Sequence, residues 1–145
     1  MNARSIHILL VEDNAADVRL MKEALHGFQH PHSLSVVQDG QEAIAFLEQT
    51  GKYAGAHRPD LVLLDINLPR RTGHEVLCHL KARPALRRVV VIMLSSSDAE
   101  KDVRQAYDCH ANCYIQKPRD LDGFFRVAAA IEAFWLDIVR LPVAV

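Results

Sequence analysis

Polar side chains able to do chemistry stand directly after four apolar segments of this sequence. In chain order they are Glu12 with Asp13, then Asp65, Ser95 and Lys117. Each apolar segment has the length of a strand, and the carboxyl ends of parallel strands meet at one edge of a sheet, where open α/β folds bind ligands. The spacing therefore predicts one site that combines three carboxylates with a hydroxyl and an amine.

Three carboxylates at one site need a positive charge beside them. Two carboxylates in close contact repel each other by about 4 kcal/mol at an effective dielectric constant of 20, so such a cluster raises its pKa values or binds a cation. Ligands that are all oxygen suit Mg²⁺, which keeps several waters and adds phosphate oxygens. With Lys117 as a second cation and Ser95 as a hydroxyl donor, Asp65 is the expected nucleophile in forming an aspartyl phosphate.

The segments that carry these residues alternate with helical patterns along the whole chain. The uninterrupted apolar run 61–64 is typical of a strand covered on both faces. Five expected strands recur at intervals of roughly 25 residues, each followed by apolar residues at helical spacing, which indicates βα units. These strands cover residues 6–11, 34–37, 60–65, 89–94 and 113–116.

The predicted fold class is α/β, a doubly wound (βα)5 sandwich around a five-stranded parallel sheet of order 2-1-3-4-5. We expect one domain over residues 1–145, with its core at about 6–139 and a short tail at 140–145. Asn14 and Asp39 are expected to cap helices, and Ser97 with Glu100 forms a capping-box pattern.

Composition argues against several functional classes. A formal net charge of -1 disfavours a nucleic-acid-binding protein, which carries a basic face. The sequence has no apolar run of about 18 residues, so no membrane span is expected, and the residues before the first strand leave no room for a signal peptide. The odd cysteine count (Cys78, Cys109 and Cys113) predicts no disulfide framework and a cytoplasmic location. Packing is the favoured role of Cys109 and Cys113, because a zinc site with His110 lacks a fourth ligand.

Taken together, these motifs give the chain a family resemblance. From about residue 6 to residue 139 it resembles the receiver domain of two-component response regulators. The resemblance is carried by Leu10-Val11-Glu12-Asp13-Asn14, Leu64-Asp65-Ile66-Asn67-Leu68-Pro69, Gly73, Ser95 and Lys117-Pro118. Each motif is weak alone, but four of them, in order at the ends of the right expected strands, are a strong signal.

The resemblance implies a specific set of roles. Asp65 would accept a phosphoryl group from the phosphohistidine of a sensor histidine kinase, with Ser95 and Lys117 on the phosphoryl oxygens. Mg²⁺ would be held by Glu12, Asp13, Asp65 and the main-chain carbonyl of Asn67. The Lys117–Pro118 bond would be cis, and the chain would be a phosphoacceptor with slow autodephosphorylation rather than an enzyme.

The final third resembles a narrower group, the single-domain regulators that partner cyanobacterial and other bacterial phytochrome kinases. His110–Ile115 and the stretch from Phe134 to Pro142 carry this likeness. Most receivers have Gly at the position of His110, so this histidine is expected to tolerate a positive φ or to change the helix cap. The likeness implies a kinase of the bacteriophytochrome type and no output domain, which leaves the downstream protein unknown.

The last expected helix, from about 120 to 139, carries more apolar residues than one core-facing stripe requires. We therefore expect a partner surface that includes Phe124, Phe134, Trp135 and Ile138. The resemblance implies a homodimer through the fourth and fifth helices. Phosphorylation would act through Ser95 and then Tyr114 as switch residues, with a coupling of about 1–3 kcal/mol.

Two other interpretations use the same residues. A phosphatase of the haloacid dehalogenase type also forms an aspartyl phosphate. The family resemblance for such enzymes includes a second acid, the general acid, two residues after the nucleophile, where this sequence has Asn67. A scaffold that works without phosphorylation is disfavoured by the full acidic set with Lys117. Glu12 and Asp13 alone could be simple helix-capping residues, and no phosphate-binding glycine loop suggests a nucleotide.

Overall fold

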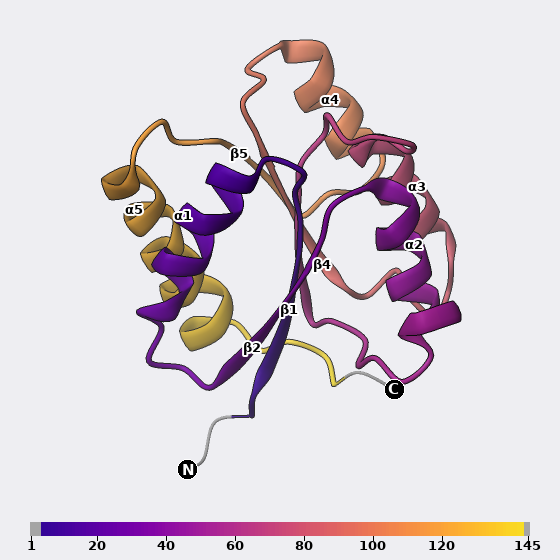
Figure 1. The fold of residues 1–145 in the computed structure, drawn as a ribbon, viewed down its shortest axis with the longest axis horizontal. Helices are drawn as coiled ribbons and strands as arrows, with labels where there is room; N and C mark the ends of the chain where they lie inside the picture. The colour runs from indigo at the N-terminus through magenta and orange to yellow at the C-terminus, as the bar shows by residue number, and fades with distance from the viewer. Residues whose placement is uncertain (1–3, 144–145) are drawn as a thin grey trace.

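The structure, a computed structural model that describes residues 4–143, is a three-layer α/β sandwich (Figure 1). Its sheet has five parallel strands in the order β2-β1-β3-β4-β5. The strands are β1 Ile6–Val11, β2 His32–Val37, β3 Leu61–Leu64, β4 Val90–Ser95 and β5 Cys113–Gln116. The helices are α1 Ala15–His26, α2 Gly40–Glu48, α3 Gly73–Ala82, α4 Glu100–Asp108 and α5 Leu121–Ile131. The predicted fold class and strand order are confirmed.

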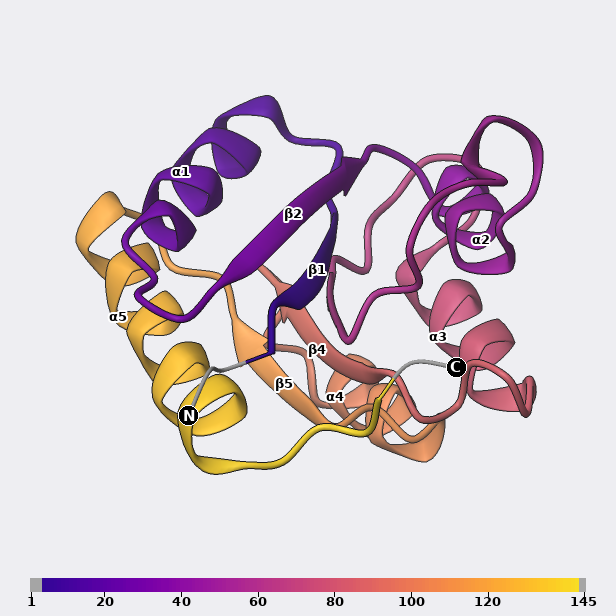
Figure 2. The same ribbon diagram turned by 90° about the horizontal axis from the view of Figure 1, so that it is seen from below.

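Helices cover both faces of the sheet, which explains the unbroken apolar strands. Seen from below, α1 and α5 lie on one side and α2, α3 and α4 on the other (Figure 2). Successive strand residues point to opposite faces: Leu9 packs with the α2 and α3 side, whereas Ile8 packs with the α1 and α5 side. All four residues of β3 are fully buried, so the strand that ends at Asp65 is held rigidly in the core.

Side chains cap most helices, as predicted for two of them. The side chain of Asn14 accepts from the Asp17 amide at 3.0 Å, and that of Asp39 accepts from the Glu42 amide at 2.7 Å. The capping box predicted at Ser97 is wrong, because α4 begins after Ala99 without a side-chain cap. The Ser97 hydroxyl donates instead to a carboxylate, which accepts a stronger hydrogen bond than a neutral group does.

The end of α4 bears out the expectation for His110, which lies in the left-handed region with φ of 69°. The cysteines do not follow the sequence prediction. Cys78 on α3 and Cys109 at the end of α4 form a disulfide. The prediction of no disulfide was wrong, because two cysteines 31 residues apart are brought together by helix packing, with their Cα atoms 5.5 Å apart.

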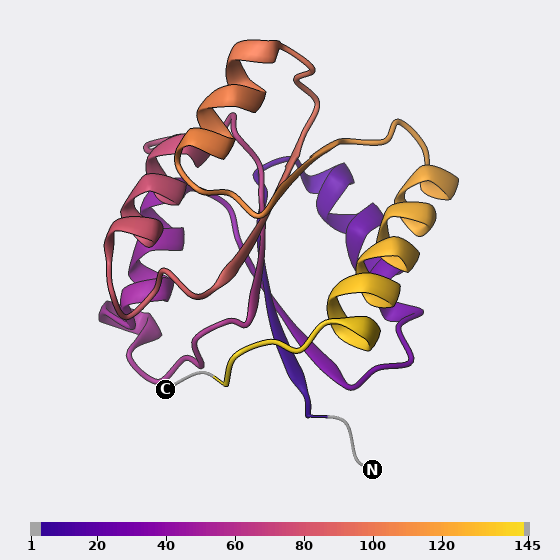
Figure 3. The same ribbon diagram turned by 180° about the vertical axis from the view of Figure 1, so that it is seen from behind.

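The chain after α5 forms a π-helical segment, Glu132–Ile138, and then crosses beneath the sheet (Figure 3). Glu132 accepts hydrogen bonds from the amides of Gln29 and His30, at 2.7 and 2.8 Å, which ties this segment to the loop after α1. Leu141 is buried against the core. Packing thus continues past residue 139, the predicted end of the core.

The exposure of the four residues predicted to form a partner surface differs from one residue to another. Phe124 is only 1% exposed, so its assignment to a surface was wrong; it packs from α5 into the core between the sheet and the layer of α1 and α5. Phe134 and Ile138 are 50% and 73% exposed, and Trp135 is half-buried.

Within residues 4–143, none of the helices combines the length and the apolar character needed to cross a bilayer.

Candidate functional site

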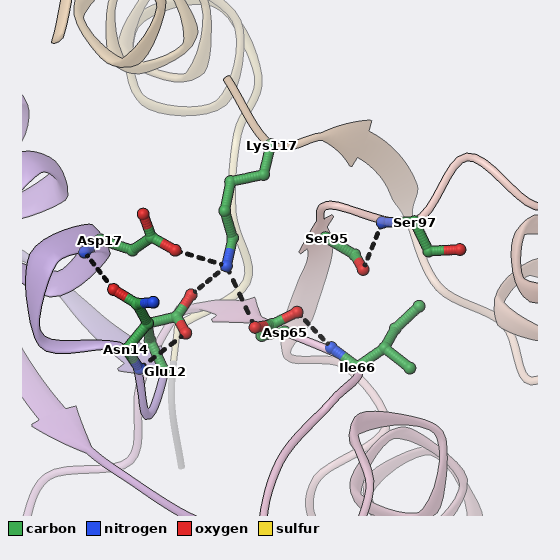
Figure 4. A network of polar contacts seen from close by, with 8 residues as sticks. All are labelled: Glu12, Asn14, Asp17, Asp65, Ile66, Ser95, Ser97 and Lys117. Carbon is green, nitrogen blue, oxygen red and sulfur yellow. Dashed lines mark hydrogen bonds and ion pairs between the residues drawn. The ribbon is translucent and has the colours of Figure 1, made fainter. Parts of the chain in front are cut away.

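The predicted residues stand at the carboxyl ends of four strands. Glu12 and Asp13 follow β1, Asp65 follows β3, Ser95 ends β4 and Lys117 follows β5. Figure 4 shows how Lys117 reaches from the β5 end over toward the acidic residues that follow β1 and β3. The site is built by the parallel sheet, because β1 lies beside β3 and β3 beside β4 in register.

Lys117 is the centre of the polar network. Its ammonium Nζ donates to Glu12 Oε1 at 2.6 Å, to Asp17 Oδ2 at 3.0 Å and to Asp65 Oδ2 at 3.1 Å. The lysine side chain is 8% exposed, and those of Glu12 and Asp65 are 3% and 8% exposed. Three charge-assisted hydrogen bonds, made where the ammonium is shielded from water, fix it in place.

Asp65 is held by both of its carboxylate oxygens. Oδ1 accepts from the main-chain amide of Ile66 at 2.7 Å, while Oδ2 accepts from Lys117. Its own amide donates to the carbonyl of Val11, which extends the β1–β3 pairing up to the site. The carboxylate therefore has a fixed direction, as a nucleophile in a positioned reaction requires.

The electrostatics of the site show that it lacks positive charge. Burial raises the pKa of Glu12, and the hydrogen bond from Lys117 lowers it. The negative charge of Asp65 raises it further, and the resulting pKa is about 7. Burial on its own lowers the pKa of Lys117, but hydrogen bonds to Glu12 and Asp17 and the charge of Asp65 more than offset it. The net pKa of Lys117 is raised, so this amine stays an ammonium.

The acidic side chains fit a hard divalent cation. Glu12, Asp13 and Asp65 each offer a carboxylate oxygen, and these oxygens lie within 4.8 Å of one another. Asp13 is exposed whereas the other two are buried, which leaves one side of the cluster open to water and to an incoming ligand. Asn67 is exposed two residues after Asp65. Oxygen donors open to solvent on one side are what Mg²⁺ or Mn²⁺ prefers.

Ser95 is fully buried and does not contact Asp65 through a hydrogen bond. Its hydroxyl accepts from the amide of Ser97 at 3.2 Å, and the carbonyl of Ser97 accepts from the Tyr114 hydroxyl at 2.8 Å. Ser97 thus connects the two residues that the sequence singled out as a switch. The Ser97 hydroxyl also donates to Asp102 on α4 at 2.6 Å.

Several participants escaped the sequence analysis. Asp17 binds Lys117 from the first turn of α1, and its place in the first turn of the helix that directly follows Glu12 and Asp13 is the signal that could have pointed to it. His74 is buried, with Nε2 3.6 Å from Asp102 Oδ1. The hydrogen bond from Ser97 lowers the pKa of Asp102, against burial, and His74 adds to the lowering.

Gly73 is required for packing at the site. A Cβ at this position would lie 2.0 Å from the carbonyl oxygen of Asp65, so only glycine allows α3 to begin there. The predicted cis Lys117–Pro118 bond was wrong, since residues 4–143 contain no cis peptide bond. A trans bond is the ordinary isomer before proline, and Lys117 reaches its three carboxylates with this bond trans.

Comparisons with known proteins agree with this fold and site. The sequence pattern of the response regulator receiver domain matches residues 8–128, and the chain belongs to this family. It is therefore a two-component response regulator receiver, a phosphoacceptor.

Its relatives include phytochrome response regulators. The chain is 47% identical over 137 residues to response regulator Rcp1 of Synechocystis sp., covering 94% of this chain and 93% of Rcp1. The fold matches the phosphorylated cyanobacterial phytochrome response regulator RcpA with a TM-score of 0.93 and 48% identity, over 97% of this chain and 100% of RcpA. It matches the Mn²⁺-bound form of Rcp1 with a TM-score of 0.90 and 46% identity, over 95% and 99% of the two chains.

Proposed function

We propose that this protein accepts a phosphoryl group on Asp65 from the phosphohistidine of a bacteriophytochrome-type sensor histidine kinase, with Mg²⁺ as the cation. The observation that carries the proposal is the ammonium of Lys117 bound to both Glu12 and Asp65 beside a cluster of three carboxylates. The similarity to Rcp1 and to RcpA supports a phytochrome kinase as the donor.

In the proposed reaction, a carboxylate oxygen of Asp65 attacks the phosphorus, an O–P bond forms and the N–P bond to the donor imidazole breaks. The electron pair of the broken bond stays on the imidazole, which takes up a proton. Mg²⁺ held by Glu12, Asp13, Asp65 and the Asn67 carbonyl would neutralise charge on the transferring group. Lys117, already 3.1 Å from Asp65 Oδ2, supplies a fixed positive charge next to the phosphoryl oxygens.

The phosphoryl group would then change the hydrogen bonding of Ser95. Its hydroxyl accepts from the Ser97 amide, and it would turn to donate to a phosphoryl oxygen instead. Loss of that contact frees the loop that Tyr114 and Asp102 hold through Ser97. The change would spread to the face formed by α4, β5 and α5.

We also propose that this face, together with Phe134 and Ile138, forms a homodimer interface. Tyr107 on α4 and Phe125 on α5 are 49% and 40% exposed, so apolar side chains remain open to solvent on both of these helices. The same face would reach a downstream protein that the sequence does not identify. We place the reaction in the cytoplasm, and slow autodephosphorylation at Asp65 would end the signal.

Phosphotransfer from a purified kinase tests the proposal. A bacteriophytochrome histidine kinase is labelled with radioactive ATP, freed of nucleotide and mixed with this protein in Mg²⁺. Label is expected to move to the wild-type chain, and neither to Asp65→Asn nor to wild-type protein in excess chelator. If label stays on the kinase although acetyl phosphate labels Asp65, the choice of a phytochrome donor is wrong while the phosphoacceptor role stands.

A further inference from the structure

The disulfide between Cys78 and Cys109 joins α3 to the end of α4, two helices on the same side of the sheet. Cys78 lies on the exposed surface of α3, and Cys109 is half-buried at the C-terminal cap of α4. The loop that the disulfide closes contains β4, Ser95 and the whole of α4. The covalent link therefore encloses the part of the chain that would move on phosphorylation.

Little else holds α4 in position. Of its nine residues only Ala106, a small side chain, is buried. Its first turn is held by Asp102, which accepts from the Ser97 hydroxyl and lies 3.6 Å from His74 on α3. A helix with so few buried apolar contacts is free to shift, so a covalent bond at its other end is a large part of its attachment.

We propose that Cys78 and Cys109 are a reversible redox modification site, and that their disulfide holds α4 in its resting position and opposes phosphorylation of Asp65. This inference rests on the proposed phosphoacceptor function for its second half. The reversibility rests on the proposed cytoplasmic location, because disulfides in reducing compartments are usually transient and redox-sensing. The exposure of Cys78 gives small thiols and disulfides access to the bond.

A small-molecule disulfide such as oxidised glutathione is the oxidant that forms the protein disulfide by thiol–disulfide exchange. The Cys78 thiolate attacks one sulfur of the small disulfide, giving a mixed disulfide and one free thiol. The Cys109 thiolate then attacks the Cys78 sulfur and displaces the second thiol. Two protein thiols are oxidised and one small disulfide is reduced to two thiols, and excess thiol reverses both steps.

Cys113 provides an internal control on the same chain. It is half-buried at the start of β5, and among the described residues it is the cysteine outside the disulfide. Burial raises the pKa of its thiol, against a hydrogen bond from Trp135, which leaves less of the reactive thiolate. Cys113→Ser is therefore expected to leave the redox response intact, whereas Cys78→Ser is expected to abolish it.

The first measurement establishes the redox state. Wild-type protein is equilibrated in glutathione buffers from fully reduced to fully oxidised, quenched in acid, alkylated and mapped by mass spectrometry. All three cysteines are expected to be alkylated in reduced buffer, and Cys113 alone in oxidised buffer. Alkylation of Cys78 and Cys109 at every ratio, or a disulfide that survives excess reduced glutathione, overturns the proposal without any variant having to fold.

The second measurement tests the effect on α4. Hydrogen exchange of residues 100–108 and the rate of labelling by acetyl phosphate are compared in the two redox states. A coupling in the usual range slows both by about five-fold or more in the disulfide form, and Cys78→Ser shows the fast values in both buffers. Equal values in the two states for wild-type protein overturn the proposal. Absence of labelling in both states instead refutes the phosphoacceptor function, and the restraint on α4 is then decided by the exchange rates alone.

Discussion

Replacing Lys117 by methionine removes the only ammonium bound to Glu12, Asp17 and Asp65 among the described residues, with little change in side-chain length. At an effective dielectric constant of 20, each of these contacts is worth about 5–6 kcal/mol before desolvation is counted. Burial of the ammonium offsets most of that gain. Removing one partner of a buried ion pair leaves the other charges uncompensated, and the net loss is about 3–5 kcal/mol.

Urea unfolding at pH 7.5 in excess chelator measures this loss. The loss in free energy of unfolding caused by Lys117→Met is expected to shrink toward pH 5, because Glu12, with its pKa of about 7, is then protonated. Addition of Mg²⁺ is expected to reduce the same loss, because the cation supplies the missing positive charge. Lys52→Met is the matched control, since Lys52 is 71% exposed in its pair with Glu42, and solvent screening leaves no resolvable change in stability. A Lys117→Met protein as stable as wild type in chelator at pH 7.5 refutes the electrostatic reasoning.

Four further results are expected. The pKa of Glu12 is about 7 in the folded protein against 4.5 unfolded, so metal-free stability falls by about 3 kcal/mol as pH rises through that window; Glu12→Gln flattens the slope in urea titrations. Gly73→Ala places a Cβ 2.0 Å from the Asp65 carbonyl and slows acetyl phosphate labelling by about 100-fold, whereas Gly55→Ala, with no atom near its Cβ, does not. Reducing the disulfide, which spans 31 residues, lowers stability by about 3–4 kcal/mol in the chain-entropy account, read from thermal melts with and without thiol. Ile138→Ser weakens self-association in sedimentation velocity, and dimers of unchanged affinity would contradict the proposed interface.

The fold and the centre of the site were predictable from the sequence for a common reason. Apolar runs alternate with helical patterns, which indicates a parallel sheet, and such a sheet places every strand end on one edge. Glu12, Asp65 and Lys117 were therefore expected at one edge of the sheet, however far apart they lie along the chain. Strand order makes β1 and β3 neighbours, whereas the side chain of Lys117 reaches past β4 from the edge strand β5.

Features that depend on how helices rotate and pack were not predictable. Asp17 reaches Lys117 from 100 residues away because α1 begins beside the site. Phe124 belongs to a helix that is apolar over much of its surface, so periodicity alone did not show which aromatic residue faces the core. Cys78 and Cys109 meet through the contact of α3 with α4, which leaves no signature in the spacing of cysteines.

The central claim is that the carboxylate of Asp65 accepts a phosphoryl group at a cation-dependent site. Incubation with acetyl phosphate and Mg²⁺, followed by intact mass measurement, tests it most directly. The account predicts a gain of one phosphoryl group that is absent in Asp65→Asn and in excess chelator. An unmodified wild-type mass, or a gain that persists in Asp65→Asn, would contradict it.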